Sequence, residues 1–211
     1  MAPEVGAGTE RAMGAGISTW TAPELRAALA DVAGGLTAGQ ERLPSSCPGW
    51  DVHDQVAHVS GLEATLAGEP LPEHEPPAAG HVKSPAGLYM ERLVDWRRSW
   101  PLARLVTELR EVTARRSVQL AELGDDGARL VPGLFGGEAP LARVLGIRVF
   151  DVYAHEQDVR RAIGRPGHLD GPVAAIVRDR IATGLAFAWA KPAAGQRIRL
   201  VVDDWTYGLD L

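Results

Sequence analysis

The apolar residues of this chain recur mostly at intervals of three and four, which is the spacing of one face of an α-helix. A capping box, Thr21-x-x-Glu24, precedes the first such stripe, and Asp51 is a candidate N-cap before the second. Ser84-Pro85 marks the start of the third, with Ser84 as a candidate N-cap and Pro85 in the first turn, where proline is favoured. The predicted helices cover about residues 21–36, 52–66, 85–123 with a kink or break at Pro101, 140–163 and 171–190.

Three segments lack this spacing. Residues 1–18 are small and polar without a period, which predicts a disordered arm, and residues 124–137 are rich in glycine, which predicts a loop. Apolar and polar residues alternate on both sides of Asp203-Asp204, which predicts a β-hairpin. The chain is therefore expected to be predominantly helical and to end in one hairpin.

An isolated hairpin is marginally stable in water. The predicted strands therefore either lie on the helices or begin a second domain of α+β type. We favour the second interpretation, in which the last part of the chain is the start of a truncated domain. The predicted division is an arm over residues 1–18, a helical domain over residues 19–190 and the start of an α+β domain over residues 191–211.

Composition excludes several classes of protein. The net charge is -5 and the basic residues are scattered among acidic ones, so no basic stripe is available for nucleic acid. No segment has the roughly 18 to 20 apolar residues that a membrane helix needs, and the first residues contain no apolar secretion signal, so we expect a cytoplasmic protein. The single cysteine excludes an internal disulfide and a zinc site of several thiolates, so a metal would be held by histidines and carboxylates.

The predicted helix over residues 140–163 carries a group of charged residues with a common orientation. Asp151, His155 and Asp158 are spaced by four and three, so they share one face, and Arg148 and Arg161 follow one turn beyond on either side. A carboxylate and an imidazole one turn apart can ligate a single ion. The same spacing also suits a solvated face of ion pairs.

A histidine on another helix strengthens the metal hypothesis. His58 lies near the edge of the apolar stripe of the predicted helix 52–66, where it could simply pair with Asp54 one turn earlier. If it instead meets Asp151 and His155 between packed helices, the three form a site with positions left open for water or substrate.

Other reactive residues have structural interpretations. Cys47 precedes a Pro-Gly turn, where we expect a buried, inert thiol, and Trp50 is expected to pack. Arg148, Arg160 and Arg161 either bind a substrate carboxylate near the metal or form solvated ion pairs.

Two segments resemble a known family. CPGWDVHDQVAHV, residues 47–59, and HEQDVRRAIG, residues 155–164, are similar to motifs of the mycothiol-dependent maleylpyruvate isomerases. The resemblance implies a DinB-like four-helix bundle, a divalent ion that is usually zinc, and a thiol cofactor. It assigns the metal to His58, His155 and Asp151. The family pattern has glutamate where this chain has Asp151, so Asp158 is kept as an alternative ligand or as a partner of a ligand.

The fold class expected from all this is all-α, a DinB-like four-helix bundle with a further helix and a C-terminal β-hairpin. The expected function is a mycothiol-dependent isomerase or S-transferase that acts on a small electrophile, as a monomer or homodimer. Two alternatives stay open. One is a non-catalytic metal-binding module for regulation or interaction, and the other is a metal-dependent hydrolase with Glu156 or Asp158 as a general base.

Overall fold

The structure is a computed structural model that describes residues 23–124, 126–134, 137–189, 195–202 and 205–210. Helices form most of this part of the chain. The elements in chain order are α2 (Pro23–Gly34), the short 3-10 helix η1 (Gln40–Arg42), α3 (Val52–Leu66), α4 (Pro85–Arg97), α5 (Leu102–Leu123), β1 (Leu130–Pro132), β2 (Glu138–Pro140), α6 (Leu141–Ala162), α7 (Gly171–Trp189), β3 (Arg197–Val202) and β4 (Trp205–Asp210).

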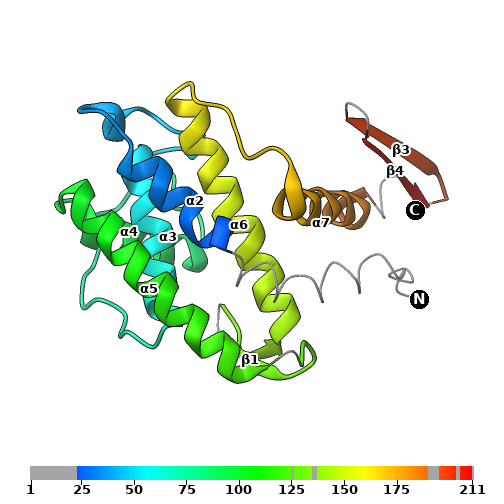
Figure 1. Cartoon of the computed structure of the whole chain (residues 1–211), viewed down its shortest axis with the longest axis horizontal. Helices are drawn as coiled ribbons and strands as arrows, with labels where there is room; N and C mark the ends of the chain where they lie inside the picture. The colour runs from blue at the N-terminus through cyan, green and yellow to red at the C-terminus, as the bar shows by residue number, and fades with distance from the viewer. Residues whose placement is uncertain (1–22, 125, 135–136, 190–194, 203–204, 211) are drawn as a thin grey trace.

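Four helices form the bundle. α2 and α3 each pack against both α5 and α6, and α4 packs on α3 (Figure 1). The four helices enclose one continuous cluster of buried apolar side chains, to which α7 adds further residues. The predicted all-α, DinB-like four-helix bundle with a further helix and a hairpin is confirmed.

The helix starts follow the predicted signals. Asp51 caps α3, because its carboxylate accepts a hydrogen bond of 2.9 Å from the backbone N–H of Asp54. The Ser84 hydroxyl caps α4 in the same way, by accepting a hydrogen bond of 3.1 Å from the backbone N–H of Gly87. The expected break at Pro101 separates α4 from α5. The capping box at Thr21 and the arm over residues 1–18 lie outside the described residues.

The predicted loop over residues 124–137 needs a correction. β1 and β2 pair antiparallel there, with Leu130 opposite Pro140 and Pro132 opposite Glu138. Strands of three residues are too short to show the alternation by which a sequence reveals a strand. This small hairpin leads the chain directly into α6.

The last part of the described chain extends away from the bundle. α7 packs against α6, and the hairpin of β3 and β4 contacts α7 on the side away from the bundle (Figure 1). The hairpin runs in register from Arg197 opposite Asp210 to Val202 opposite Trp205, as the alternation predicted. Its assignment to a second, truncated domain stays a prediction.

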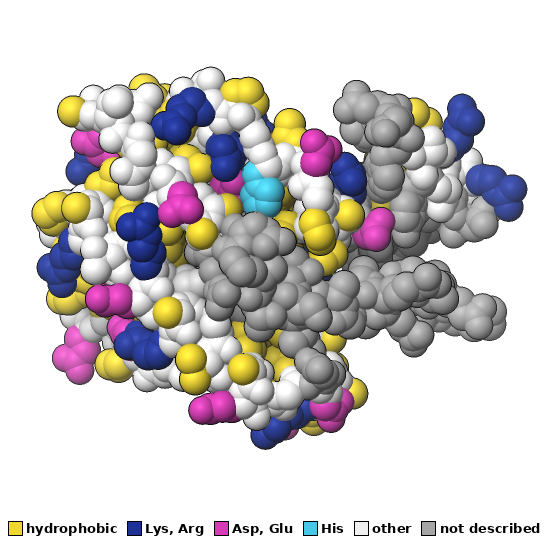
Figure 2. Space-filling model, viewed as in Figure 1, with side chains coloured by type: hydrophobic (Ala, Val, Ile, Leu, Met, Phe, Trp, Pro, Cys, Tyr) yellow, Lys and Arg dark blue, Asp and Glu magenta, His cyan; other side chains and the backbone are white. Residues whose placement is uncertain are grey.

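The surface shows no concentration of one charge on the face drawn in Figure 2, where acidic and basic side chains are interspersed. None of the helices within the described ranges is both long and apolar enough to span a membrane.

Candidate metal centre

The site is built on α3, whose side chains are buried continuously from Val52 to Ala64 although many are polar. Buried polar groups are unfavourable unless they are paired, so this helix needs polar partners on its neighbours. Gln55, His58 and Glu63 have their partners on α6, whereas the other buried polar residues of α3 contact α5 or the segment between α4 and α5. The buried polar residues of α3 are His53, Asp54, Gln55, His58, Ser60 and Glu63.

The three predicted metal ligands lie together between α3 and α6. His58 Nε2 lies 3.3 Å from Asp151 Oδ2, and His155 Nε2 lies 3.6 Å from Asp151 Oδ1. The three donor atoms of this group all lie within 4.8 Å of one another. Ligands about 2.1 Å from one ion at tetrahedral or octahedral angles are about 3.0 to 3.4 Å apart, so these spacings are close to those of a coordination shell. The alternative in which His58 pairs with Asp54 is not what the structure shows, because Asp54 contacts Arg98 instead.

The two imidazoles also contact each other and a tryptophan. The ring centroids of His58 and His155 are 4.5 Å apart, and the Trp50 ring lies 5.2 Å from the first and 6.2 Å from the second. Trp50 is fixed by a hydrogen bond of 2.8 Å from its indole N–H to the buried carboxylate of Glu91. Trp50 therefore packs as predicted, and it forms one wall of the histidine pair.

Gln55 orients His155. Its side-chain oxygen makes a short hydrogen bond with His155 Nδ1, and its amide nitrogen donates to the Ser45 hydroxyl at 2.7 Å. A proton on Nδ1 that is donated to Gln55 leaves the lone pair on Nε2, the nitrogen that faces Asp151. Metal-binding histidines commonly donate their other ring N–H to an oxygen in this way.

Arg148 holds the carboxylate from inside the bundle. Its guanidinium donates to Asp151 at 2.7 Å and to Glu63 at 2.8 Å, and the residue is only 1% exposed. Arg148 was considered for substrate binding or for a solvated ion pair, whereas the structure shows it joining two carboxylates in the interior. The side chain of Arg161, the other predicted substrate-binding residue, is 68% exposed and donates to Asp158 and Ser46.

The electrostatics of the triad separate the protonation states of its members. Burial alone would raise the pKa of Asp151, but the charge of Arg148 and the two histidines outweigh it and hold the pKa well below its usual value. Burial lowers the pKa of His58. Burial also disfavours the charged form of His155, but its contacts with Asp151 and Cys47 have the larger effect and raise its pKa to about 9. In the metal-free protein, His155 is therefore the imidazole whose proton an ion must displace at neutral pH.

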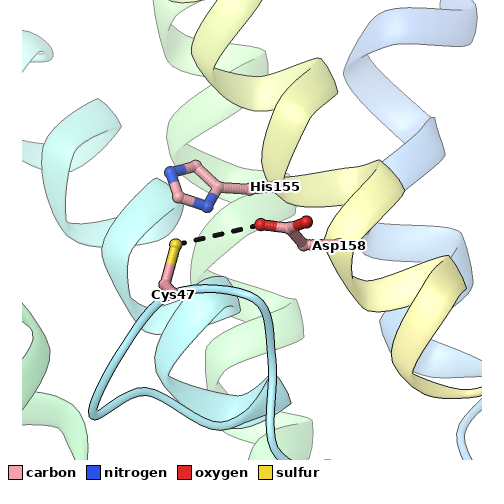
Figure 3. A group of neighbouring side chains, drawn as sticks. All are labelled: Cys47, His155 and Asp158. Atoms are coloured by element: carbon pink, nitrogen blue, oxygen red, sulfur yellow. Dashed lines mark hydrogen bonds between the residues drawn. The ribbon is translucent and has the colours of Figure 1, made fainter.

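Asp158 faces a different group. Its Oδ2 lies 3.8 Å from Cys47 Sγ, and Figure 3 shows Asp158 beside His155 on α6, with Cys47 approaching them from the turn that precedes α3. Cys47 was expected to be buried, and this expectation was wrong, because the turn lies at the surface and leaves the thiol partly buried. Asp151, not Asp158, is the carboxylate that the structure brings to both predicted histidine ligands.

Glu156 is separated from the triad. It is fully buried, and its carboxylate contacts His168 at 2.8 Å and Arg160 at 2.7 Å. Arg160 is therefore paired within its own helix. A general base must reach the water or substrate on which it acts, and both oxygens of Glu156 are engaged elsewhere.

Sequence reasoning missed the residues that support the triad. Gln55 precedes His58 by three positions and so shares its face, a signal that was available in the sequence. The pairing of Glu63 with Arg148 joins positions 85 residues apart, and no local pattern reveals it. The hydrogen bond from Trp50 to Glu91 is of the same long-range kind.

The donor set fits a divalent ion of the zinc type. Two imidazole nitrogens and one carboxylate are ligands that zinc uses in open, three-ligand protein sites. The Nδ1 atom of His58 is buried without a hydrogen-bond partner among the described residues, so the polar contact of this ring lies on the side of Asp151. Three protein ligands would leave one position of a four-coordinate ion for a further ligand.

Comparisons with known proteins identify a matching family and two structures of similar fold. The sequence model of the mycothiol maleylpyruvate isomerase N-terminal domain matches residues 22–160. Two solved structures are similar in fold, each with a TM-score of 0.61 and with 95% of this chain and 80% of the other aligned. They are crystal structures of the mycothiol-dependent maleylpyruvate isomerase, at 17% identity, and of a histidine-to-alanine mutant of it, at 16%. Among curated proteins, no sequence relative was found.

Proposed function

The chain belongs to the mycothiol maleylpyruvate isomerase N-terminal domain family, and from this premise we propose that it is a metal-binding, thiol-dependent isomerase or S-transferase for a small electrophile. The observation that carries the proposal is the meeting of His58 from α3 with Asp151 and His155 from α6. Mycothiol is the proposed thiol and zinc the proposed ion. We also propose that the protein acts in the cytoplasm.

The proposed roles follow from the contacts. His58, Asp151 and His155 would hold the ion. A divalent ion in such a site acts as a Lewis acid that favours the thiolate form of a bound thiol at neutral pH. Gln55 keeps the Nε2 lone pair of His155 directed at the site, and Arg148 fixes Asp151 from the interior. The proposal assigns no covalent role to a side chain of the protein.

The proposed reaction begins with one step and has two possible outcomes. Addition of a thiolate to an activated double bond, rotation about the resulting single bond and elimination of the thiolate give an isomerase. Retention of the adduct gives a transferase. The Trp50 ring lies beside the two imidazoles and would form one side of the space in which the thiol and the electrophile meet.

Two alternatives make different predictions. A non-catalytic metal-binding module would keep the triad and turn over no electrophile. A metal-dependent hydrolase would act without added thiol and would need a base beside the site, and the engaged carboxylate of Glu156 speaks against that role. Strict dependence of turnover on an added thiol separates our proposal from both.

The test combines metal content with turnover. We expect about one divalent ion per purified chain and thiol-dependent conversion of a small unsaturated oxo-acid, and we expect His155→Ala to lose most of the ion and the activity. His74→Ala is the matched control, because His74 pairs with Asp95 outside the triad. Equal metal content in the wild type and His155→Ala would refute the site, and turnover without thiol would refute the reaction.

A further inference from the structure

We propose that Cys47, His155 and Asp158 form a second metal position, which contains sulfur and shares His155 with the first triad. The donor atoms of these three residues also lie within 4.8 Å of one another. Figure 3 shows one ring nitrogen of His155 facing the gap between the Cys47 sulfur and the Asp158 carboxylate. The occupant would be a thiophilic divalent ion such as zinc or cadmium.

The donors come from two segments that the fold holds together. Cys47 lies on the turn before α3, and its backbone N–H donates to the Ser45 hydroxyl at 3.2 Å. Asp158 and His155 lie one turn apart on α6. Arg161 donates to Asp158 at 2.9 Å and to Ser46 on the turn at 2.8 Å, so it ties the two segments together. The position is therefore assembled by the native fold rather than by chance contacts of a free thiol.

The chemistry of this group differs from that of the first triad. A thiolate, an imidazole and a carboxylate are all ligands that zinc accepts, and the sulfur adds a preference for soft ions that the first triad lacks. The thiol is partly buried and thus accessible to an ion from solvent. Because the sequence contains one cysteine, no second thiol of the chain competes for it.

Sharing His155 makes the two positions alternatives. A neutral imidazole has one lone pair for ligation, so it serves one ion at a time. In the first triad that lone pair lies on Nε2, while Nδ1 is engaged by Gln55. Occupation of the second position requires the nitrogen nearer Cys47 to become the ligand. The chain is therefore expected to bind one ion in either of two places, which are separated by the imidazole ring.

The proposal shares one ligand with the proposed function but does not depend on its reaction. The experiment uses cobalt(II) as the probe, because a cobalt–thiolate bond gives a charge-transfer absorption band that nitrogen and oxygen ligands do not give. The band is measured in His58→Ala, which breaks only the first triad, and again after Cys47→Ser or His155→Ala is added to that background. Circular dichroism of each variant shows whether the bundle is folded.

We expect His58→Ala to show the band at one cobalt per chain, and both double variants to lose it. A folded His58→Ala protein without the band would overturn the second position. A band that survives His155→Ala would also overturn it, since the sulfur would then bind cobalt without its proposed partner. Thiol-dependent turnover is measured separately. A protein that shows the band but no turnover would refute the proposed reaction and leave the second metal position standing. A protein that shows turnover but no band would refute only the second metal position.

Discussion

The bundle contains two helix interfaces of opposite character. Between α2 and α5 most of the buried residues are apolar, and Leu25, Leu29, Leu105 and Leu109 all belong to the buried apolar cluster. Between α3 and α6, buried polar residues lie next to apolar ones. Apolar packing at the first interface supplies the ordinary hydrophobic contribution to stability.

The α3–α6 interface buries charged groups in addition to apolar ones. Burying Glu63 and Arg148 together carries a desolvation penalty that a pair of apolar residues would avoid. Arg148 of this ion pair also donates to Asp151. Gln55, which lies on α3 like Glu63, forms a hydrogen bond with His155. The comparison teaches that Gln55, His58 and Glu63 of α3 are arranged around or linked to the three donor atoms, whereas the apolar residues of α2 and α5 pack against each other.

The largest difference between the interfaces is expected on removal of the buried arginine. Arg148→Met leaves Glu63 buried without its 2.8 Å partner and should lower the free energy of unfolding by about 3 to 5 kcal/mol. It should also weaken metal binding by the folded protein, because Asp151 loses its internal anchor. Urea unfolding and metal titration measure the two effects.

The matched control is Leu105→Ala at the apolar interface. Loss of this fully buried side chain should lower the free energy of unfolding by about 2 to 5 kcal/mol and leave metal affinity of the folded protein unchanged. If both variants weaken metal binding equally, the two interfaces do not differ in their contribution to the metal site.

The next effect is a pH dependence confined to the polar interface. The pKa of His155 is raised to about 9, so below that pH an ion must displace its proton. Metal affinity should therefore rise by about 50-fold between pH 7 and pH 9 and level off above pH 10 at about 100-fold over its value at pH 7. Because the pKa of His155 is higher in the folded protein than its ordinary value of 6.5, its protonation stabilises the metal-free fold. This stabilisation is complete below pH 6.5 and is lost as the pH rises through about 9. Chelator-buffered titrations across this range measure the affinity, and a flat profile would contradict the assignment of His155.

A smaller effect is expected from the residue that orients His155. Gln55→Ala removes the hydrogen-bond acceptor of His155 Nδ1 and should weaken metal binding by about 10 to 100-fold. Ser60→Ala is the control, because Ser60 is buried on the same helix but donates to Glu108 away from the triad. Metal titration of both should show a loss in the first variant only.

The smallest effect is expected in the tail. Deletion of the residues after Lys191 should leave the helical circular dichroism of the bundle nearly unchanged, because a single hairpin adds little independent stability. The hairpin contacts α7 and no predicted ligand lies on it. Cooperative loss of helix signal on truncation would show instead that the tail is part of the helical domain.

The elements that local patterns specify could be predicted. Asp51, Ser84 and Pro101 mark helix boundaries through hydrogen bonds and backbone restrictions that involve near neighbours, and the structure follows them. The hairpin of β1 and β2 was missed because three residues do not establish a period. The alternation in the longer strands β3 and β4 was sufficient.

The site divides in the same way. The spacing of Asp151 and His155 on one helix is local and was visible in the sequence. His58 was a candidate from its place on the second helix, and the resemblance to a family assigned all three as ligands. What packing alone decides was not visible: that Asp151 and not Asp158 reaches both histidines, and that Arg148 turns inward to Glu63. These outcomes depend on the rotation of α6 against α3, which periodicity does not fix.

The most direct test of the central claim compares the two carboxylates on α6. Asp151 lies between His58 and His155, whereas Asp158 lies beside Cys47, so the account predicts that Asp151→Asn abolishes tight zinc binding and Asp158→Asn weakens it by no more than about 10 to 100-fold. Chelator-competition titrations of the two folded variants against the wild type provide the measurement. A larger loss of zinc affinity in Asp158→Asn than in Asp151→Asn would contradict the proposed triad.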